Sequence, residues 1–460
     1  MKRRMHADLD MTQGSIARNL VQFALPLMAT SILQLLYNAA DVMVVGRFAG
    51  SQALAAVGST GSLINLLTQL FMGLSLGSNV LIAHANGAGD YKKVSRAVHS
   101  SISLALISGV AVMLLGLCAS RPMLHLMGSP EDVIDLASMY MAIYFAGMPA
   151  NMLYNFGASV LRATGDTRSP LVYLSISGLA NVLLNLLLVI VFHMGVAGVA
   201  IATVVSQALS AAFVIIHLVR TEGKIHLDFR RLCLNKDDVK EIVRIGLPAG
   251  VQGCLFSVSN VIIQSTVNAQ GSLVMAGNAA SGNLEGFIGG TMGSFSSALL
   301  TFVSTNRGAR NYSRVRKAPW VAIGLVAVLA FGVGVIGLTF GETLLSLYNS
   351  DPEVIKWGMV RLGIMAPTYF LCGLMDLGAS QLRATGYSVT PMIVSLSGAC
   401  LFRIFWIFAI LPLNPTMQML YISYPISWLL TFIVHFCCYL LLSVPRMRRE
   451  EKAYLQEQNA

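Results

Sequence analysis

The chain has 460 residues, of which 55% are hydrophobic and only 11% are Asp, Glu, Lys or Arg. Soluble domains usually carry about 25% charged residues, so this composition excludes an ordinary soluble globular protein. The formal net charge is +10, and the basic residues lie in short clusters between apolar runs. Such clusters are typical of membrane topology signals, and we expect no nucleic-acid partner.

Apolar runs bounded by turn residues predict two sets of six helices. The first set lies near residues 16–45, 53–83, 93–118, 133–159, 168–193 and 196–219. The second set lies near residues 239–268, 273–304, 313–341, 353–380, 389–411 and 416–443. Most of these runs reach the about 20 residues that a membrane span needs. We therefore expect an all-α membrane protein of about twelve transmembrane helices in two six-helix lobes.

The longest polar stretch lies between the two sets and predicts the domain organisation. We expect an N-terminal lobe over residues 1–219, a linker over 220–238, a C-terminal lobe over 239–443 and a tail over 444–460. Basic residues are concentrated in the linker and in alternate loops. The positive-inside rule therefore predicts that the linker, the tail and both chain termini face the cytoplasm.

An internal repeat is visible in residue identities. Gly157-Ala158-Ser159 and Leu161-Arg162-Ala163-Thr164-Gly165 return at one constant spacing as Gly378-Ala379-Ser380 and Leu382-Arg383-Ala384-Thr385-Gly386. Pro170 returns as Pro391 at the same spacing. With six spans each, the two halves would be related by a pseudo-two-fold axis along the membrane normal, as in transporters that work by alternating access.

Three motifs together resemble the bacterial type of the MATE (multidrug and toxic compound extrusion) family. They are Leu25-Pro26 followed by Asp41, the Leu161-Arg162-Ala163-Thr164-Gly165 turn, and the segment Gly195-Val196-Ala197-Gly198-Val199-Ala200-Ile201-Ala202-Thr203. The resemblance implies secondary active export of organic cations or toxins in antiport with H⁺ or Na⁺. It further implies small cationic, amphipathic substrates, a lipid bilayer as surroundings, no cofactor and no enzymatic reaction.

Asp41 is the first candidate for a coupling residue. An ionisable side chain at mid-membrane depth costs at least about 2.5 kcal/mol, so its presence favours a function. The resemblance implies that this acid belongs to a cation-coupling site with Asn181 and Asn185, which share one helix face. The hydroxyl of Tyr37 could add an oxygen to this site. A Na⁺ ion could bind near Asp41. Asn185 departs from the family, in which an Asp is often found at this position, and the alternative is a structural carboxylate paired with a neighbouring donor such as Arg47.

Four further residues are candidates for a substrate cavity: Glu285, Asp376, Tyr140 and Asn38. Glu285 is the one acid of the predicted helix 273–304, and Asp376 lies one turn before the second Leu-Arg-Ala-Thr-Gly motif. Both acids could bind a cationic substrate or a coupling ion. The alternative for Glu285 is a structural ion pair with Arg361 or Arg403.

Two other functions compete with multidrug efflux. A flippase for a lipid-linked oligosaccharide precursor would need cavity arginines for anionic headgroups, and Arg361 and Arg403 keep it open. A membrane enzyme would need a motif such as His-Glu-x-x-His, which the sequence lacks. We expect no catalytic residue, and a monomer that crosses the cell inner (cytoplasmic) membrane several times.

Overall fold

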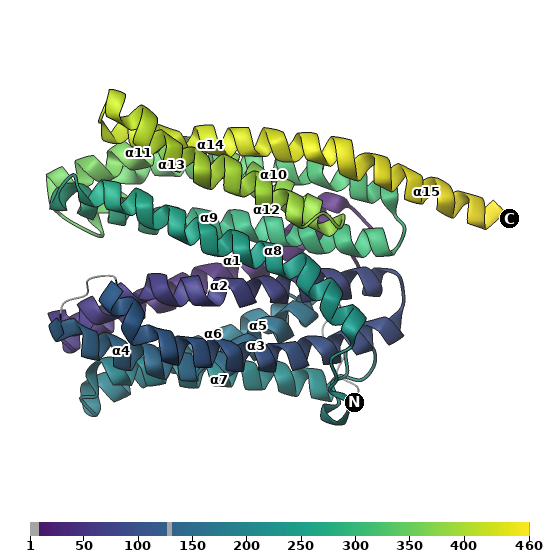
Figure 1. Ribbon diagram of the computed structural model, residues 1–460, viewed down its shortest axis with the longest axis horizontal. Coiled ribbons are helices and arrows are strands. Elements are labelled where there is room, and N and C mark those ends of the chain that lie inside the picture. Colours follow the sequence, from purple (N-terminus) through teal and green to yellow (C-terminus); the bar gives the residue numbers. More distant parts are fainter. Residues whose placement is uncertain (1–8, 127–130, 460) are drawn as a thin grey trace. The chain divides into compact units, whose positions relative to one another are not determined.

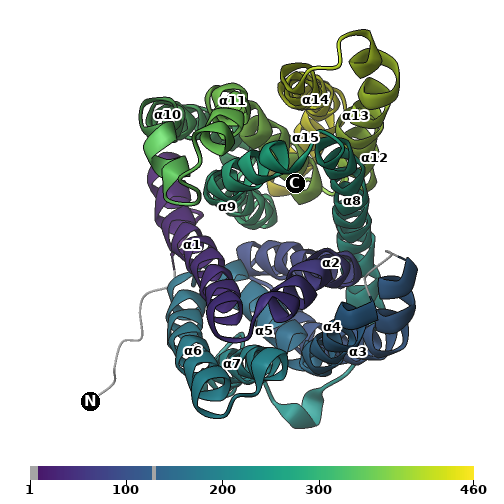
Figure 2. The ribbon, with the colours of Figure 1, turned by 90° about the vertical axis from the view of Figure 1, so that its left-hand side faces the viewer.

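The computed structural model describes residues 9–126 and 131–459, and this part of the chain is helical throughout, without a strand (Figure 1). The helices form two compact units. The first contains residues 29–254 together with Leu9 and Asp10, and the second contains residues 11–28 and those from Leu255 onward. In the end-on view of Figure 2, each unit is a bundle of helices.

The helices of the first half follow one another with short connections. They are α1 (Ile16–Phe48), α2 (Ser51–Gly87), α3 (Tyr91–Leu126), α4 (Glu131–Ala146), α5 (Met148–Ala163), α6 (Arg168–Leu186) and α7 (Gly195–Arg220). A π-helical turn, Leu187–Val191, extends α6. A short 3₁₀ turn, Phe229–Arg231, lies in the linker between α7 and the next helix.

The second half repeats this order. Its helices are α8 (Lys236–Asn268), α9 (Ser272–Gly308), α10 (Tyr312–Ser346), α11 (Pro352–Ala384), α12 (Val389–Ser395), α13 (Phe402–Phe405), α14 (Met417–Cys438) and α15 (Val444–Asn459). The π-helical segments Leu396–Leu401 and Trp406–Ile410 join α12 and α13 into one continuous rod, which the 3₁₀ turn Leu411–Leu413 ends. A third π-helical segment, Tyr439–Ser443, joins α14 to α15.

Eleven helices in the described residues are long and apolar enough to cross a membrane, and the pair α4 and α5 supplies a twelfth span that is bent by 47°. Large apolar side chains also face outward, among them Val328 and Phe331 on α10, each 75% exposed. Exposure on this scale suits lipid and not water. The chain is therefore a multi-pass, all-α membrane protein, as its composition predicts.

The bend between α4 and α5 divides the predicted helix 133–159. Gly147 interrupts the helix, and Pro149 occupies the first turn of α5, where its missing N–H leaves no donor unsatisfied. Gly147 is also packed against the side chain of Val204, so a larger residue would not fit there. The predicted span is thus present as a broken helix.

The repeated Leu-Arg-Ala-Thr-Gly motif ends a helix in both halves. Gly165 and Gly386 adopt φ values of 100° and 95°, in the left-handed region that glycine tolerates. The N–H after each glycine donates back to the motif's leucine, Asp166 to Leu161 at 3.0 Å and Tyr387 to Leu382 at 2.9 Å. This is a Schellman stop signal, which explains why the motif recurs.

In each unit, an arginine in the first two turns of a helix binds a segment that is distant in the sequence. In the second unit, the guanidinium of Arg314 donates to the backbone oxygens of Met11 and Gly14, at 3.0 and 2.6 Å, just before α1. In the first unit, Arg96 of α3 pairs with Asp238 of α8 at 2.8 Å. These contacts explain why residues 11–28 group with the second unit and the start of α8 with the first.

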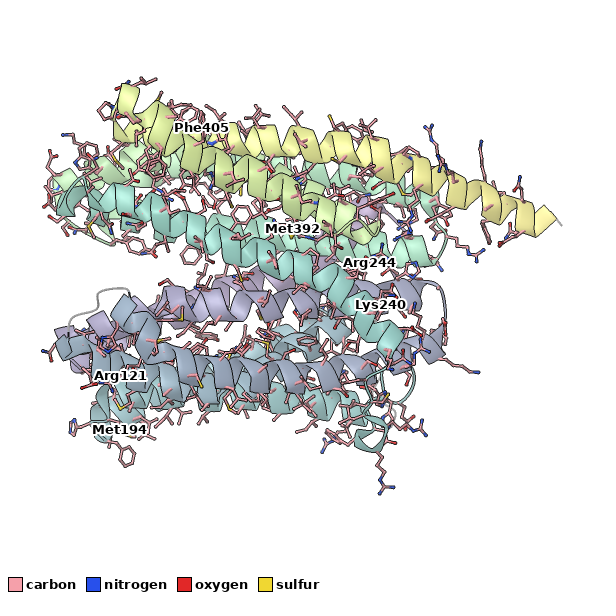
Figure 3. All side chains as sticks on the ribbon, in the orientation of Figure 1. Arg121, Met194, Lys240, Arg244, Met392 and Phe405 are labelled. Atoms are coloured by element: carbon pink, nitrogen blue, oxygen red, sulfur yellow. The ribbon has the colours of Figure 1, made fainter. Side chains whose placement is uncertain are left out.

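Basic residues lie at both ends of the first unit (Figure 3). Figure 3 places Lys240 and Arg244 of α8 toward one end and Arg121 and Met194 at the other. Arg121 has its carboxylate partner Asp135 within 3.2 Å.

Candidate functional site

A polar cavity of about 310 Å³ lies inside the first unit. Helices α1, α2, α4, α5, α6 and α7 contribute to its wall. The polar side chains of the wall include Gln34, Tyr37, Asn38, Asp41, Asn65, Asn151, Asn181 and Thr203. Among the described residues that line this cavity, Asp41 is the single acid.

Asp41 is held by side chains from two other helices. The Asn185 amide of α6 donates to Asp41 Oδ1, and Thr203 Oγ1 of α7 lies 3.4 Å from Oδ2. The same Asn185 amide donates to Asn181 Oδ1 at 3.3 Å, one helical turn earlier. Asn185 is fully buried, and its Oδ1 has no hydrogen-bond partner among the described residues. The carboxylate therefore sits beside a buried, unused oxygen acceptor.

The predicted coupling residues thus meet at one place. The spacing of Asn181 and Asn185 puts both amides on one face of α6, and that face meets Asp41 of α1. Tyr37, one turn before Asp41, packs its ring against Gly178 of α6. A side chain at Gly178 would collide with this ring, so the glycine permits the close approach of the two helices.

The two remaining candidates of the first unit, Asn38 and Tyr140, differ in their position relative to the cavity. Asn38 lines the cavity. Tyr140 is 7% exposed and stacks on Tyr144 with ring centroids 6.1 Å apart, and Tyr144 lines the cavity in its place. Sequence reasoning missed Thr203 of α7, although it lies in the quoted segment 195–203 and contacts Asp41.

A second cavity, of about 500 Å³, lies inside the second unit. Glu285 of α9 and Asp376 of α11 both line it, as do Arg361 and Arg403. Glu285 forms a bidentate ion pair with Arg361, at 2.6 Å from Nε to Oε1 and 2.7 Å from Nη2 to Oε2. The ion pair that sequence reasoning set out as an alternative for Glu285 is therefore present, and its partner is Arg361.

A network of polar side chains surrounds this pair. Arg361 Nη1 donates to Asn278 Oδ1 at 2.5 Å, and Ser281 Oγ donates to Glu285 Oε1 at 3.1 Å. The Tyr421 hydroxyl also donates to Asn278 Oδ1, at 3.1 Å. Asn278 and Tyr421 were not predicted from sequence, because neither carries a charge that stands out in an apolar run. An ion pair whose groups have this many hydrogen-bond partners should make the surrounding part of the second unit rigid.

Comparisons with known proteins agree with the fold and the repeat. The MatE family model matches twice, over residues 26–187 and 248–408. Probable multidrug resistance protein YoeA of Bacillus subtilis is 28% identical over 84% of this chain and 85% of its own length. Probable multidrug resistance protein NorM of Thermotoga maritima is 26% identical over 83% of this chain and 82% of its own.

Solved structures show the same fold. A multidrug resistance MATE family transporter of the MOP superfamily, in an outward-facing conformation, superposes with a TM-score of 0.88 at 20% identity. The match covers 99% of this chain and 100% of that one. The two family-model matches together span well over half of the chain. The chain belongs to the MATE family of transporters.

Proposed function

We propose that the chain is a secondary active efflux transporter, which exports organic cations or toxins in antiport with H⁺ or Na⁺ by alternating access. The family and the multidrug resistance proteins among its relatives support the transport of small molecules. They favour this function over the flipping of a lipid-linked oligosaccharide. The observation that carries the coupling is the place of Asp41, the single acid in the wall of a polar cavity.

One carboxylate can couple two cations by competition. A substrate cation and a coupling ion would both be attracted to Asp41, and occupancy by one weakens the binding of the other. Entry of the coupling ion from outside would then favour release of the substrate there. Asn185 and Thr203 orient the carboxylate for both steps, since they contact its two oxygens.

The surroundings of Asp41 suit either coupling ion. A proton needs the carboxylate alone. A Na⁺ ion would be a transported ion here, and it prefers several oxygen ligands. The carboxylate of Asp41, the free Asn185 Oδ1 and the hydroxyl of Thr203 offer such oxygens. We place the protein in the cytoplasmic membrane as a monomer, with both termini in the cytoplasm.

Efflux of ethidium from energised cells tests this proposal. The wild type should lower the cell-associated dye, and Asp41→Asn should abolish this efflux at equal abundance in the membrane. The amide has no negative charge to attract a cation and does not take up a proton as the carboxylate does. Collapse of the proton gradient and of the sodium gradient in separate experiments identifies the ion. Undiminished efflux by Asp41→Asn would overturn the role of this residue.

A further inference from the structure

Arg403 is a buried arginine in the wall of the second cavity. It lies within the continuous rod that contains α13 and is 4% exposed. Its Nε donates to Ser427 Oγ at 2.8 Å. Its guanidinium stacks over the Tyr424 ring, 4.1 Å from the centroid, and lies 5.7 Å from the centroid of Trp428. Its Nη2 has no hydrogen-bond partner among the described residues.

Neither carboxylate in the wall of this cavity forms an ion pair with Arg403. Glu285 is bound at both oxygens by Arg361. Asp376 also lines the cavity. In the described part of the chain, no carboxylate comes within ion-pair distance, 4.0 Å, of Arg403. Arg403 is thus a buried cation without an ion-pair partner among these residues.

An unpaired buried cation is unfavourable unless something neutralises it. Burial removes the guanidinium from water, and the rings of Tyr424 and Trp428 compensate only part of that loss. A charged residue at membrane depth usually marks a substrate pathway. Arg403 also has no counterpart in the first half, where Val182 occupies the corresponding position of the repeat. The internal repeat therefore does not account for an arginine at this position.

We propose that the cavity of the second unit binds the carboxylate group of aromatic substrates, and that the free edge of Arg403 donates to it. The inference rests on the proposed transport function and extends its substrates from cations to aromatic carboxylates. A guanidinium fork matches a carboxylate in geometry and charge. Tyr369 and Trp428, with ring centroids 5.2 Å apart, offer the aromatic wall for the rest of such a molecule.

Two ligands with one ring system test the proposal: 1-naphthoate and 1-naphthamide. Their binding to the purified full-length chain in detergent is measured by isothermal titration calorimetry, with empty micelles as the blank. The wild type should bind 1-naphthoate at least about tenfold more tightly than 1-naphthamide, as expected for a hydrogen bond between charged groups. Equal affinity for the two would overturn the proposal without any variant.

Two variants of Arg403 and one control variant test whether Arg403 supplies the positive charge that binds the carboxylate. Arg403→Gln should lose the preference for 1-naphthoate, and Arg403→Lys should keep part of it. Arg121→Gln removes the same charge from an exposed position and should bind 1-naphthoate as the wild type does. Retained preference in a folded Arg403→Gln chain would contradict the assignment. Binding in detergent needs no ion gradient, so a failure of coupled efflux would leave this result standing, and the reverse also holds.

Discussion

Asp41 and Glu285 are both membrane-embedded acids, yet their surroundings differ. Neutral side chains, Asn185 and Thr203, contact Asp41, whereas an arginine occupies both oxygens of Glu285. A carboxylate without a cationic partner is available to a transported cation. A carboxylate already paired would have to exchange its arginine for that cation. The contrast supports Asp41 as the coupling residue and a structural part for Glu285.

The orientation of Asp41 should depend on the buried amide of Asn185. Asn185→Leu keeps a similar volume and removes the donor to Asp41, and a hydrogen bond to a charged group contributes about 1.5–3 kcal/mol. Coupled ethidium efflux should fall about tenfold or more. Asn181→Leu, which removes an acceptor for Asn185 but leaves the donor to Asp41 in place, is the matched comparison and should have a smaller effect. An equal or larger loss of efflux in Asn181→Leu would contradict the greater role of Asn185.

The ion pair of Glu285 and Arg361 should behave as a structural unit. Removal of one partner leaves a buried charge unpaired, which costs about 3–5 kcal/mol. Glu285→Leu and Arg361→Leu should therefore each lower the apparent Tm in detergent strongly. The double variant, with both replaced, should recover much of the loss. If the two single losses simply add in the double variant, the pair is not the stabilising unit.

Close helix contacts in the first unit depend on glycine. Gly73 and Gly77 of α2 face Gly246 and Gly250 of α8, and a Cβ added at Gly73 would meet the backbone of Gly246 and Gly250. Backbones this close leave no room for a side chain, an arrangement common in membrane helix pairs. This crossing joins the first part of α8 to the first unit.

Substitution at this crossing should be costly. Gly73→Ala forces a backbone shift, and overpacking of this kind costs about 1–3 kcal/mol. A lower apparent Tm and lower abundance in the membrane are expected. Gly324→Ala is the control, because Gly324 is exposed on α10 with open space around its Cβ position. Its stability should be unchanged or slightly raised by the better helix propensity of alanine. Equal behaviour of the two variants would contradict the close crossing.

Much of the architecture could be predicted from sequence. The helix predicted over residues 196–219 is found as Gly195–Arg220, because an apolar run between glycine and basic residues marks both of its ends. The helix predicted to end at residue 118 continues through the charged Arg121 and ends at Leu126. Asn181 and Asn185 could be grouped because their spacing puts two polar side chains on one face of an apolar helix, and the family resemblance joins them to Asp41.

Other features leave no comparable signal in one sequence. The partners of Glu285 and Asp41 come from distant helices, so the choice of Arg361 over Arg403, and the presence of Thr203, depend on packing. The grouping of residues 11–28 with the second unit depends on Arg314, far along the chain. The π-helical turns that follow Asn185 and precede Phe402 depend on tertiary packing and not on local propensity.

Ion-driven transport by the purified chain tests the central claim most directly. The protein is placed in liposomes without ATP, ethidium is added, and a sodium gradient or a pH gradient is imposed separately. The account predicts that one of the two gradients drives ethidium against its own concentration difference in the wild type, and that neither does so in Asp41→Asn. Accumulation by Asp41→Asn, or none by the wild type under either gradient, would contradict an antiporter coupled through Asp41.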